Sequence, residues 1–348
     1  MRVGVLGCGA ISDIYLQNLT TKLDGVRVTA CADSAEERAQ GAAAKWGADA
    51  MRPEELLRSP NVDCVLLLTP PVTHYPLGME VLSCGKHLYT EKPLALTAAE
   101  GRRLLEEADK RGLRVGCAPD TFLGAGLQTV FAAIGQGAIG RPLAASAFML
   151  CGGHEVWHPN PAFYYQPGGG PILDMGPYAL TALVKIFGSP EEVCAMGMRG
   201  ASEREIATGP RQGERFPVLV DTFLSAQVRF AGGAIITLIY SFDTAPTTLP
   251  HLEIYGETGT ILGPDPNFFG GAVRVGSRST GLWRDLPLLE GFPAENMRGV
   301  GLCEMSRAIR EGRPHQADGH TGLQVTAIME AVLRSAEERR PVRLPVEE

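Results

Sequence analysis

A turn near the N-terminus carries the first residues whose types and spacing suggest chemistry. Residues 1–12 lead from a short apolar segment into Gly7, Gly9 and the small Ser12. Glycines at such a turn let the backbone approach a pyrophosphate at the N-terminus of the next helix. Asp33 ends the following apolar segment, 33 − 7 = 26 residues after the first glycine, where a carboxylate can bind both adenosine ribose hydroxyls. The pattern predicts dinucleotide binding, and the alternative is a tight turn that merely packs a helix on a strand.

A lysine follows a later apolar segment in the same part of the chain. Glu91, Lys92 and Pro93 come just after a predicted strand at residues 87–89, at the sheet edge where ligands bind in open α/β folds. Pro93 restrains Lys92 to an extended backbone, which helps to hold the lysine in place. A lone lysine after a strand is usually a solvated surface charge. In a chain that also has the glycine turn, this tripeptide predicts a catalytic Lys92.

One segment matches a zinc-protease motif by its letters alone. Residues 154–158 read His-Glu-Val-Trp-His, a pattern that binds zinc only on an α-helix, where positions i and i+4 share a face. Gly-Gly precedes the segment and Pro-Asn-Pro follows it, so we expect no useful α-helix and no metal site. Trp157 and His158 are instead candidates for lining a substrate pocket, because they offer an apolar ring face and a polar tip, with ordinary loop packing as the alternative.

The elements that must position these residues fall into two groups along the chain. The first third alternates apolar segments with helical patterns, as a doubly wound parallel sheet requires. Strands are predicted at 2–6, 25–31, 63–68, 87–89 and 114–116, and helices near 12–21, 35–46, 53–57, 76–83 and 98–110. We therefore expect a Rossmann NAD(P)-binding domain over residues 1–120.

After about residue 120 the pattern changes to longer strands and hairpins. Strands are predicted at 142–150, 222–230, 234–242, 252–255, 260–262 and 272–275, and helices near 174–187, 303–310 and 322–338. Residues 121–348 should form an α+β domain with a mainly antiparallel sheet. Residues 118–126 are predicted to join the two domains, and the side chain of Asp120 is predicted to reach the substrate pocket. Residues 201–217 are predicted to be an exposed loop with no assigned function.

Length and composition are those of a two-domain globular protein. The 348 residues exceed the ~250 to 300 at which a single core stops growing. The net charge of −7 and the lack of a basic block argue against nucleic acid or an anionic membrane as partner. No apolar segment approaches the ~20 residues of a membrane span. Because a strand is predicted from residue 2, we expect no export signal. The eight scattered cysteines are typical of reduced core residues, which predicts a cytoplasmic protein.

Several motifs together resemble the Gfo/Idh/MocA oxidoreductase family over essentially the whole chain. They are Gly7-Cys8-Gly9-Ala10-Ile11, Thr69-Pro70-Pro71 with His74, Gly85-Lys86-His87, Glu91-Lys92-Pro93, and the segment 168–176. The resemblance implies a dinucleotide-binding domain coupled to an α+β domain with a large, mainly antiparallel open sheet, which serves substrate binding and oligomerisation. The residues predicted to bind the cofactor are Gly7, Gly9, Ala10, Ile11, Asp33, Thr69, Pro70, His74, Glu91 and Lys92.

The resemblance also implies a proton-transfer role for Tyr178. Members that resemble inositol dehydrogenase have histidine at this position. A tyrosine here is similar to the branch of glucose-fructose oxidoreductase and dimeric dihydrodiol dehydrogenase, in which tyrosine is the acid/base beside the lysine. Asp174 and Tyr178 are four residues apart, so they share one face of a helix. Because a phenol has a pKa near ~10, it needs a cation such as Lys92 to act as a base at neutral pH. The alternative roles are a helix N-cap for Asp174 and a packed ring for Tyr178.

These observations predict an NAD(P)-dependent oxidoreductase that acts on a secondary alcohol or ketone of a sugar, glycoside or cyclic polyol. Lys92, Tyr178 and Asp174 are the predicted catalytic residues. The predicted substrate contacts are Lys92, Asp120, Trp157, His158, Asp174 and Tyr178. NAD is expected over NADP because Asp33 would repel a 2′-phosphate, although Ser34 and Arg38 leave NADP open.

Two other function classes remain as alternatives at this point. One is a redox sensor that binds a dinucleotide without catalysis, and the other is a zinc hydrolase built on residues 154–158. An open sheet with one uncovered apolar face, as the family resemblance implies, predicts a homodimer or homotetramer.

Overall fold

Six parallel strands form the sheet of the N-terminal part of the chain. Their order across the sheet is β3-β2-β1-β4-β5-β6. Their bounds are β1 Arg2–Leu6, β2 Arg27–Ala32, β3 Asp49–Ala50, β4 Cys64–Leu67, β5 His87–Thr90 and β6 Val115–Cys117. All residues of β4 and β6 are buried, as expected for strands that are covered on both faces. The predicted parallel sheet is confirmed, and only the short, exposed β3 was not predicted.

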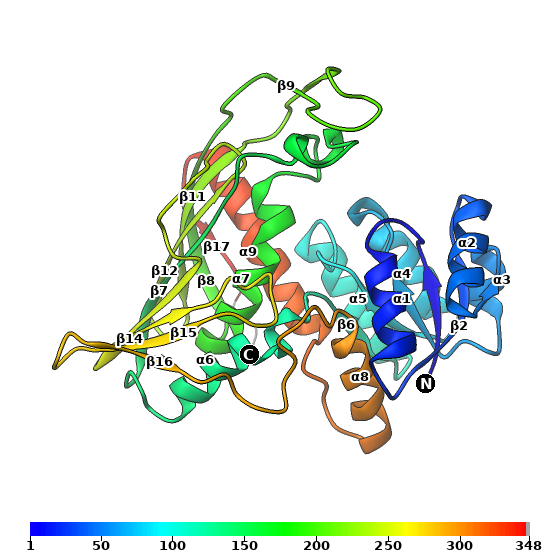
Figure 1. The fold of residues 1–348 in the computed structure, drawn as a ribbon, viewed down its shortest axis with the longest axis horizontal. Coiled ribbons are helices and arrows are strands. Elements are labelled where there is room, and N and C mark those ends of the chain that lie inside the picture. The colour runs from blue at the N-terminus through cyan, green and yellow to red at the C-terminus, as the bar shows by residue number, and fades with distance from the viewer. Residues whose placement is uncertain (346–348) are drawn as a thin grey trace. The chain divides into compact units, whose positions relative to one another are not determined.

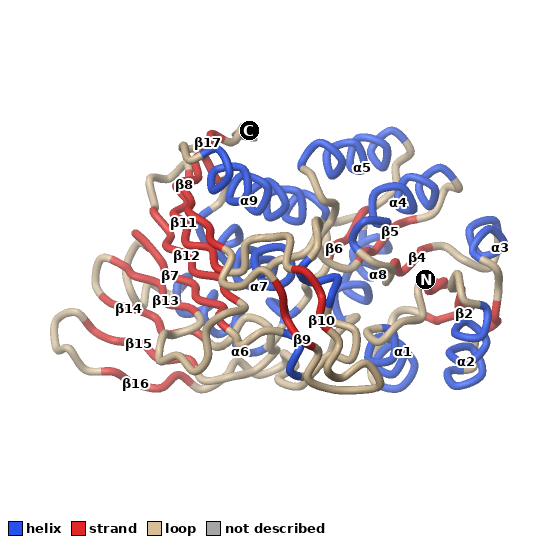
Figure 2. The backbone as a smooth tube through the Cα atoms, turned by 90° about the horizontal axis from the view of Figure 1, so that it is seen from above, coloured by secondary structure: helices blue, strands red, loops and turns tan. Residues whose placement is uncertain are grey.

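Helices cover both faces of this sheet. They are α1 Ser12–Thr21, α2 Glu36–Trp46, α3 Pro53–Arg58, α4 His74–Ser83 and α5 Ala98–Lys110. Helices α1 and α2 pack together on one face and α4 and α5 on the other (Figure 2). Thr97 caps α5, because its side-chain oxygen accepts a hydrogen bond from the Glu100 N–H at 3.2 Å.

The computed structural model describes residues 1–345, which divide into two units (Figure 1). The first unit contains residues 1–123 together with 296–326, whereas the sequence placed the latter segment in the second domain. This segment holds α8 Val300–Glu311 and the start of α9 Gly319–Glu338. This segment returns to the first unit and pairs beside β6, where the Cys117 N–H donates to the Ala317 carbonyl at 3.0 Å.

The second unit contains residues 124–295 and the described residues from 327 on. Its sheet has nine strands in the order β16-β15-β14-β13-β7-β12-β11-β8-β17. Their bounds are β7 Pro142–Leu150, β8 Pro190–Met198, β11 Phe223–Phe230, β12 Ile235–Ser241, β13 Leu252–Gly256, β14 Gly259–Gly263, β15 Val273–Ser277, β16 Trp283–Leu286 and β17 Val342–Arg343. Among the strands within residues 1–345, β7 and β12 are the one parallel pair of this sheet, so the predicted, mainly antiparallel sheet is confirmed.

Helices cover one face of this large sheet and leave its other face exposed. Helix α7 Pro171–Phe187 packs on β7, β11 and β12, and α6 Ala125–Gly135 packs on β14 and β15. The C-terminal half of α9 lies on the same face (Figure 1). On the opposite face Met196 is 79% exposed and Met198 is 55% exposed. Alternation along the strands therefore buries one face under helices and leaves the other uncovered.

Two local predictions for the second unit were wrong. Helix α7 begins at Pro171, three residues before the predicted start, and it contains Pro177 in its interior. Residues 201–217 are not simply a loop, because β9 Glu203–Glu205 and β10 Arg215–Pro217 pair antiparallel in a separate two-stranded sheet. None of the helices within residues 1–345 has the length and apolar character needed to cross a membrane.

Candidate functional site

The glycine turn between β1 and α1 is shaped by contact with another backbone segment. Gly7 has φ +103°, and a Cβ at this position would lie 2.8 Å from the carbonyl carbon of Leu68. Only glycine fits there. A Cβ at Gly9 would meet no atom within 4 Å, so that side of the turn is open. The turn thus combines a tight fold with the open approach that a pyrophosphate needs.

Asp33 at the end of β2 is fixed beside this turn. Its Oδ2 accepts a hydrogen bond from the Cys8 N–H at 2.7 Å, and its Oδ1 accepts one from the Ala35 N–H at 2.8 Å. The carboxylate is therefore oriented by the backbone before any ligand arrives. Ala10 and Ile11 follow the turn directly, and Ile11 is the N-cap position of α1.

Lys92 is held through its neighbour Glu91 at the end of β5. Glu91 Oε2 accepts from the Lys92 N–H at 2.9 Å, and Oε1 accepts from the buried Tyr15 hydroxyl of α1 at 2.7 Å. Burial raises the pKa of Tyr15, so this hydroxyl keeps its proton as a donor. The Lys92–Pro93 peptide bond is cis, and Lys92 is half-buried. Glu91 thus braces the backbone of the predicted catalytic lysine against α1.

His74 connects the loop after β4 to the same lysine segment. Its Nδ1 lies 2.7 Å from the Pro93 carbonyl and its Nε2 lies 2.8 Å from the Thr69 carbonyl. The side chain is buried, and this burial lowers its pKa. Because both ring nitrogens face protein carbonyls, His74 holds the two loops together, and its cofactor contact stays a prediction. The Thr73 hydroxyl also donates to the Thr69 hydroxyl at 2.7 Å.

Asp120 lies inside the first unit and has a structural role. It is 1% exposed, and its Oδ2 accepts from the N–H groups of Gly299 and Gly301 at 2.8 and 3.0 Å. These groups begin α8, so Asp120 satisfies donors that a helix N-terminus leaves open. Burial raises the pKa of Asp120 to about 6. Asp120 therefore caps α8 through these two bonds, and its contact with substrate stays a prediction.

In the second unit a glycine-rich turn sets the start of α7. Gly170 has φ +99°, and its N–H donates to the Tyr164 carbonyl at 2.7 Å. A Cβ at Gly169 would lie 2.6 Å from the Phe163 carbonyl oxygen, so this turn packs closely on the short 3₁₀ helix η4 Ala162–Tyr165. The turn places Asp174 in the first turn of α7.

Asp174 has a partner that the sequence did not reveal. Its Oδ2 lies 2.7 Å from Nε2 of His154, and both side chains are largely buried. Tyr178 lies one turn further along α7 and is also buried. The pair forms because the segment after β7 brings His154 back over the N-terminal turn of α7.

The segment 154–158 has the irregular conformation expected from its sequence. His154–Val156 forms one 3₁₀ turn, η3, so His154 and His158 do not share an α-helical face. Among residues 1–345, no group of three or more His, Cys, Asp or Glu side chains is suited to hold a metal ion. Trp157 is 57% exposed, and its ring centroid lies 5.3 Å from that of His158. Burial lowers the pKa of His158.

A buried ionic network supports this segment from the β9–β10 hairpin. Arg204 donates hydrogen bonds to Glu155 and to Asp243, and its side chain is 13% exposed. Burial alone would lower the pKa of Arg204, but its acidic neighbours outweigh burial and raise it. Tyr165 also donates to Glu155 and accepts from the His154 N–H at 3.1 Å. The hairpin is therefore connected to His154 through charged groups.

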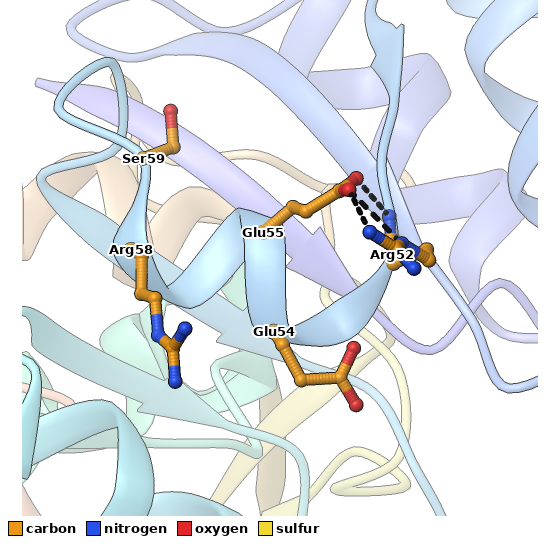
Figure 3. A pocket seen from close by; sticks show the side chains of 5 residues that line it. All are labelled: Arg52, Glu54, Glu55, Arg58 and Ser59. Carbon is orange, nitrogen blue, oxygen red and sulfur yellow. Dashed lines mark hydrogen bonds and ion pairs between the residues drawn. The ribbon is translucent and has the colours of Figure 1, made fainter.

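A surface hollow elsewhere in the first unit contains none of the predicted site residues. It lies at α3, and its lining is Arg52, Glu54, Glu55, Arg58 and Ser59 (Figure 3). Arg52 and Glu55 form an exposed ion pair of 2.6 Å at the start of that helix. The hollow is open and lined mostly by charged side chains, and none of them is a predicted catalytic or binding residue.

The sequence patterns could not find His154 and Arg204. His154 is twenty residues from Asp174 in the chain, and the only signal at that position was a zinc motif that the glycines and prolines contradict. Arg204 lies in a charged stretch, where a buried arginine is indistinguishable from an exposed one. Both are recognised only from their contacts.

Comparisons with known proteins agree over the whole chain. The family model "Oxidoreductase family, NAD-binding Rossmann fold" matches residues 1–118, and the "GFO/IDH/MocA C-terminal domain" matches residues 127–262. A myo-inositol 2-dehydrogenase of Thermotoga maritima is 27% identical, aligned over 99% of this chain and 98% of its own. A 1,5-anhydro-D-fructose reductase of Ensifer adhaerens is 27% identical over 96% of both chains. The solved structure of a levoglucosan dehydrogenase in complex with NADH and L-sorbose is 20% identical with a TM-score of 0.85, covering 99% of both chains.

Proposed function

Because the chain belongs to the Gfo/Idh/MocA family of NAD-binding oxidoreductases, we propose that it interconverts a secondary alcohol and a ketone on a sugar, glycoside or cyclic polyol. The observation that carries this proposal is the brace on Lys92, whose backbone is fixed by Glu91 at the carboxyl end of β5. Relatives named as inositol dehydrogenase and anhydrofructose reductase support the substrate class. A protein that only senses a dinucleotide needs no such lysine.

The residues at the glycine turn fit a dinucleotide. The open side of Gly9 would admit the pyrophosphate at the N-terminus of α1, with Ala10 and Ile11 beside it. We assign the loop at Thr69 and Pro70 to the same cofactor. Asp33 would accept the ribose hydroxyls and repel a 2′-phosphate, which favours NAD over NADP. When bound, NAD takes up or returns the hydride of the reacting carbon.

The remaining chemistry falls to side chains of the protein. We assign Lys92 to polarise the reacting oxygen by donating a hydrogen bond from its ammonium group. Tyr178 in its phenolate form takes the hydroxyl proton when the alcohol is oxidised, and as the phenol it returns that proton when the ketone is reduced. Asp174 accepts a hydrogen bond from a substrate hydroxyl, and Trp157 and His158 contact the rest of the ring. The carbon loses its hydrogen with both bonding electrons, and the oxygen loses only a proton, so the alcohol becomes a ketone.

A substrate screen tests this proposal. Purified protein is incubated with NAD or NADP and a panel of sugars, glycosides and cyclitols, and the reduced cofactor is followed by its fluorescence. We expect turnover with at least one compound and a higher kcat/KM with NAD. Dinucleotide binding without any turnover would favour the sensor. One zinc per chain by elemental analysis, with hydrolysis that chelators abolish, would favour the hydrolase.

We further propose that the protein forms a homodimer or homotetramer through the uncovered face of the large sheet. Exposed apolar residues on that face, Met196, Met198 and Ile235, support contact with a second copy. Light scattering after size exclusion would measure the mass, and Met196→Glu should reduce it to that of the monomer if this face is the interface. The eight cysteines are free thiols, which supports a reducing, cytoplasmic location.

A further inference from the structure

His154 is the residue in the second unit whose surroundings the proposed function does not yet explain. Its Nε2 lies 2.7 Å from Oδ2 of Asp174, and its side chain is 8% exposed against 17% for the aspartate. A contact of this length between an imidazole and a carboxylate is a charge-assisted hydrogen bond. Because little water reaches it, the bond restricts the carboxylate more than a surface contact would.

Aromatic side chains fix the plane of the His154 ring. Its centroid lies 4.2 Å from the centroid of Tyr164, 4.5 Å from that of Phe242 and 5.3 Å from that of Trp157. Packing on several sides leaves the imidazole little freedom to rotate, since each alternative rotamer would displace an aromatic ring. The direction of Nε2 toward the aspartate is therefore set by packing.

The two ring nitrogens of His154 have different surroundings. Nε2 faces Asp174, whereas Nδ1 is buried and has no hydrogen-bond partner among residues 1–345. A neutral imidazole carries one N–H and one bare nitrogen. The Nε2–H tautomer pairs its only donor with the carboxylate and leaves just an acceptor unpaired, so the surroundings favour that tautomer.

Hydrogen bonds also hold the backbone of His154 in place. Its N–H donates to the Tyr165 hydroxyl at 3.1 Å, and that hydroxyl donates to Glu155. Glu155 is held in turn by Arg204 of β9, which also binds Asp243. This chain of bonds runs from the β9–β10 hairpin to the peptide N–H of His154.

We propose that His154 is a positioning residue, which orients the carboxylate of Asp174 by donating a hydrogen bond from Nε2. The β9–β10 hairpin keeps His154 in place through Arg204 and Glu155. This inference rests on the proposed function, in which Asp174 binds a substrate hydroxyl. Occupation of Oδ2 by His154 restricts the directions in which the carboxylate presents itself to substrate, and so places the reacting carbon.

Two substitutions of His154 separate positioning from packing. His154→Phe keeps an aromatic ring in the cage but has no donor, whereas His154→Gln keeps an N–H donor of similar reach. We expect His154→Phe to lower kcat about 10- to 100-fold, the scale of a lost bond to a charged group, with the KM for NAD unchanged within twofold. His154→Gln should recover most of that loss. Wild-type kcat in His154→Phe, or equal losses in both variants, would overturn the proposal.

A spectroscopic measurement tests the contact without using activity. Long-range ¹⁵N–¹H spectra of the imidazoles in the full-length protein report the tautomer of each histidine, and the signal that is missing from His154→Gln belongs to His154. We expect the Nε2–H tautomer in the wild type and loss of that preference in Asp174→Asn, because an amide can pair with either tautomer. A dominant Nδ1–H tautomer would overturn the proposal. An Nε2–H tautomer in a protein that turns over no sugar or polyol would refute the proposed function and leave the contact standing.

Discussion

The strongest prediction for stability concerns Arg204 in the β9–β10 hairpin. Its guanidinium lies between two carboxylates, Glu155 and Asp243, whose side chains are only 11% and 18% exposed. Arg204→Met removes the charge while preserving much of the apolar volume. It leaves two largely buried carboxylates without their shared cation, and breaking a buried ion pair from one side typically costs about 3–5 kcal/mol.

The same hairpin provides a matched control. Arg211 pairs with Glu214 at 2.7 Å, but these side chains are 49% and 52% exposed. Arg211→Met removes an arginine of the same hairpin from a pair that water screens, so the expected loss is below about 1 kcal/mol. Comparing the two variants cancels any general effect of losing one positive charge from this hairpin.

Urea unfolding measures the free energy of unfolding of the wild type and of both variants. The transition is monitored by tryptophan fluorescence and circular dichroism. We expect Arg204→Met to lose at least about 2 kcal/mol more than Arg211→Met. Adding Glu155→Gln to Arg204→Met should recover part of the loss, because it removes one unpaired charge. If the two single variants lie within about 1 kcal/mol of each other, the network is not the buried support described above.

Three further predictions concern the site and its surroundings. Lys92→Ala should lower kcat by at least ~100-fold while the Kd for NAD stays within a few-fold, and near-normal turnover would remove the lysine from the mechanism. Tyr178→Phe should lower kcat by ~100-fold or more with little change in Tm; retained turnover with a lower Tm would show that the hydroxyl is structural. The pKa of Asp120 is raised to about 6 from 3.8, so the folded state binds more protons than the unfolded state between these values, and stability falls as the pH rises through this window. The free energy of unfolding should fall by about 3 kcal/mol across this window. The fall should be absent in Asp120→Asn, as measured by urea unfolding at pH values between the two pKa values.

The fold could be predicted from sequence largely because its signals are local. Strand β1 and helices α1 and α5 have the predicted bounds. Apolar segments mark the elements themselves, and glycine or proline residues mark where they end. The grouping of 296–326 with the first unit could not be read from the sequence, because the return of the chain to β6 depends on long-range contacts such as Asp120 with Gly299. Strand β8 was missed because glycine and exposed methionines weaken its alternation.

The same difference between local and long-range signals applies to the residues of the candidate site. The glycine turn, Asp33 and Lys92 stand next to strands whose ends were predicted, so their positions followed from the strand pattern. The sequence named His74 as a cofactor contact and Asp120 as a substrate contact, but it could not show that these side chains are buried against carbonyls or N–H groups. His154 could not be connected with Asp174, because the path of the loop between β7 and α7 is set by tertiary packing.

The central claim is that this protein transfers hydride from the carbinol carbon of a sugar or polyol to NAD. The most direct measurement uses a substrate from the screen that carries deuterium at that carbon, with mass spectrometry of the reduced cofactor. We predict that the deuterium appears in the reduced cofactor formed by the wild type, and that Lys92→Ala forms this product far more slowly. A reduced cofactor without deuterium, or none from any sugar, glycoside or cyclitol, would contradict the claim.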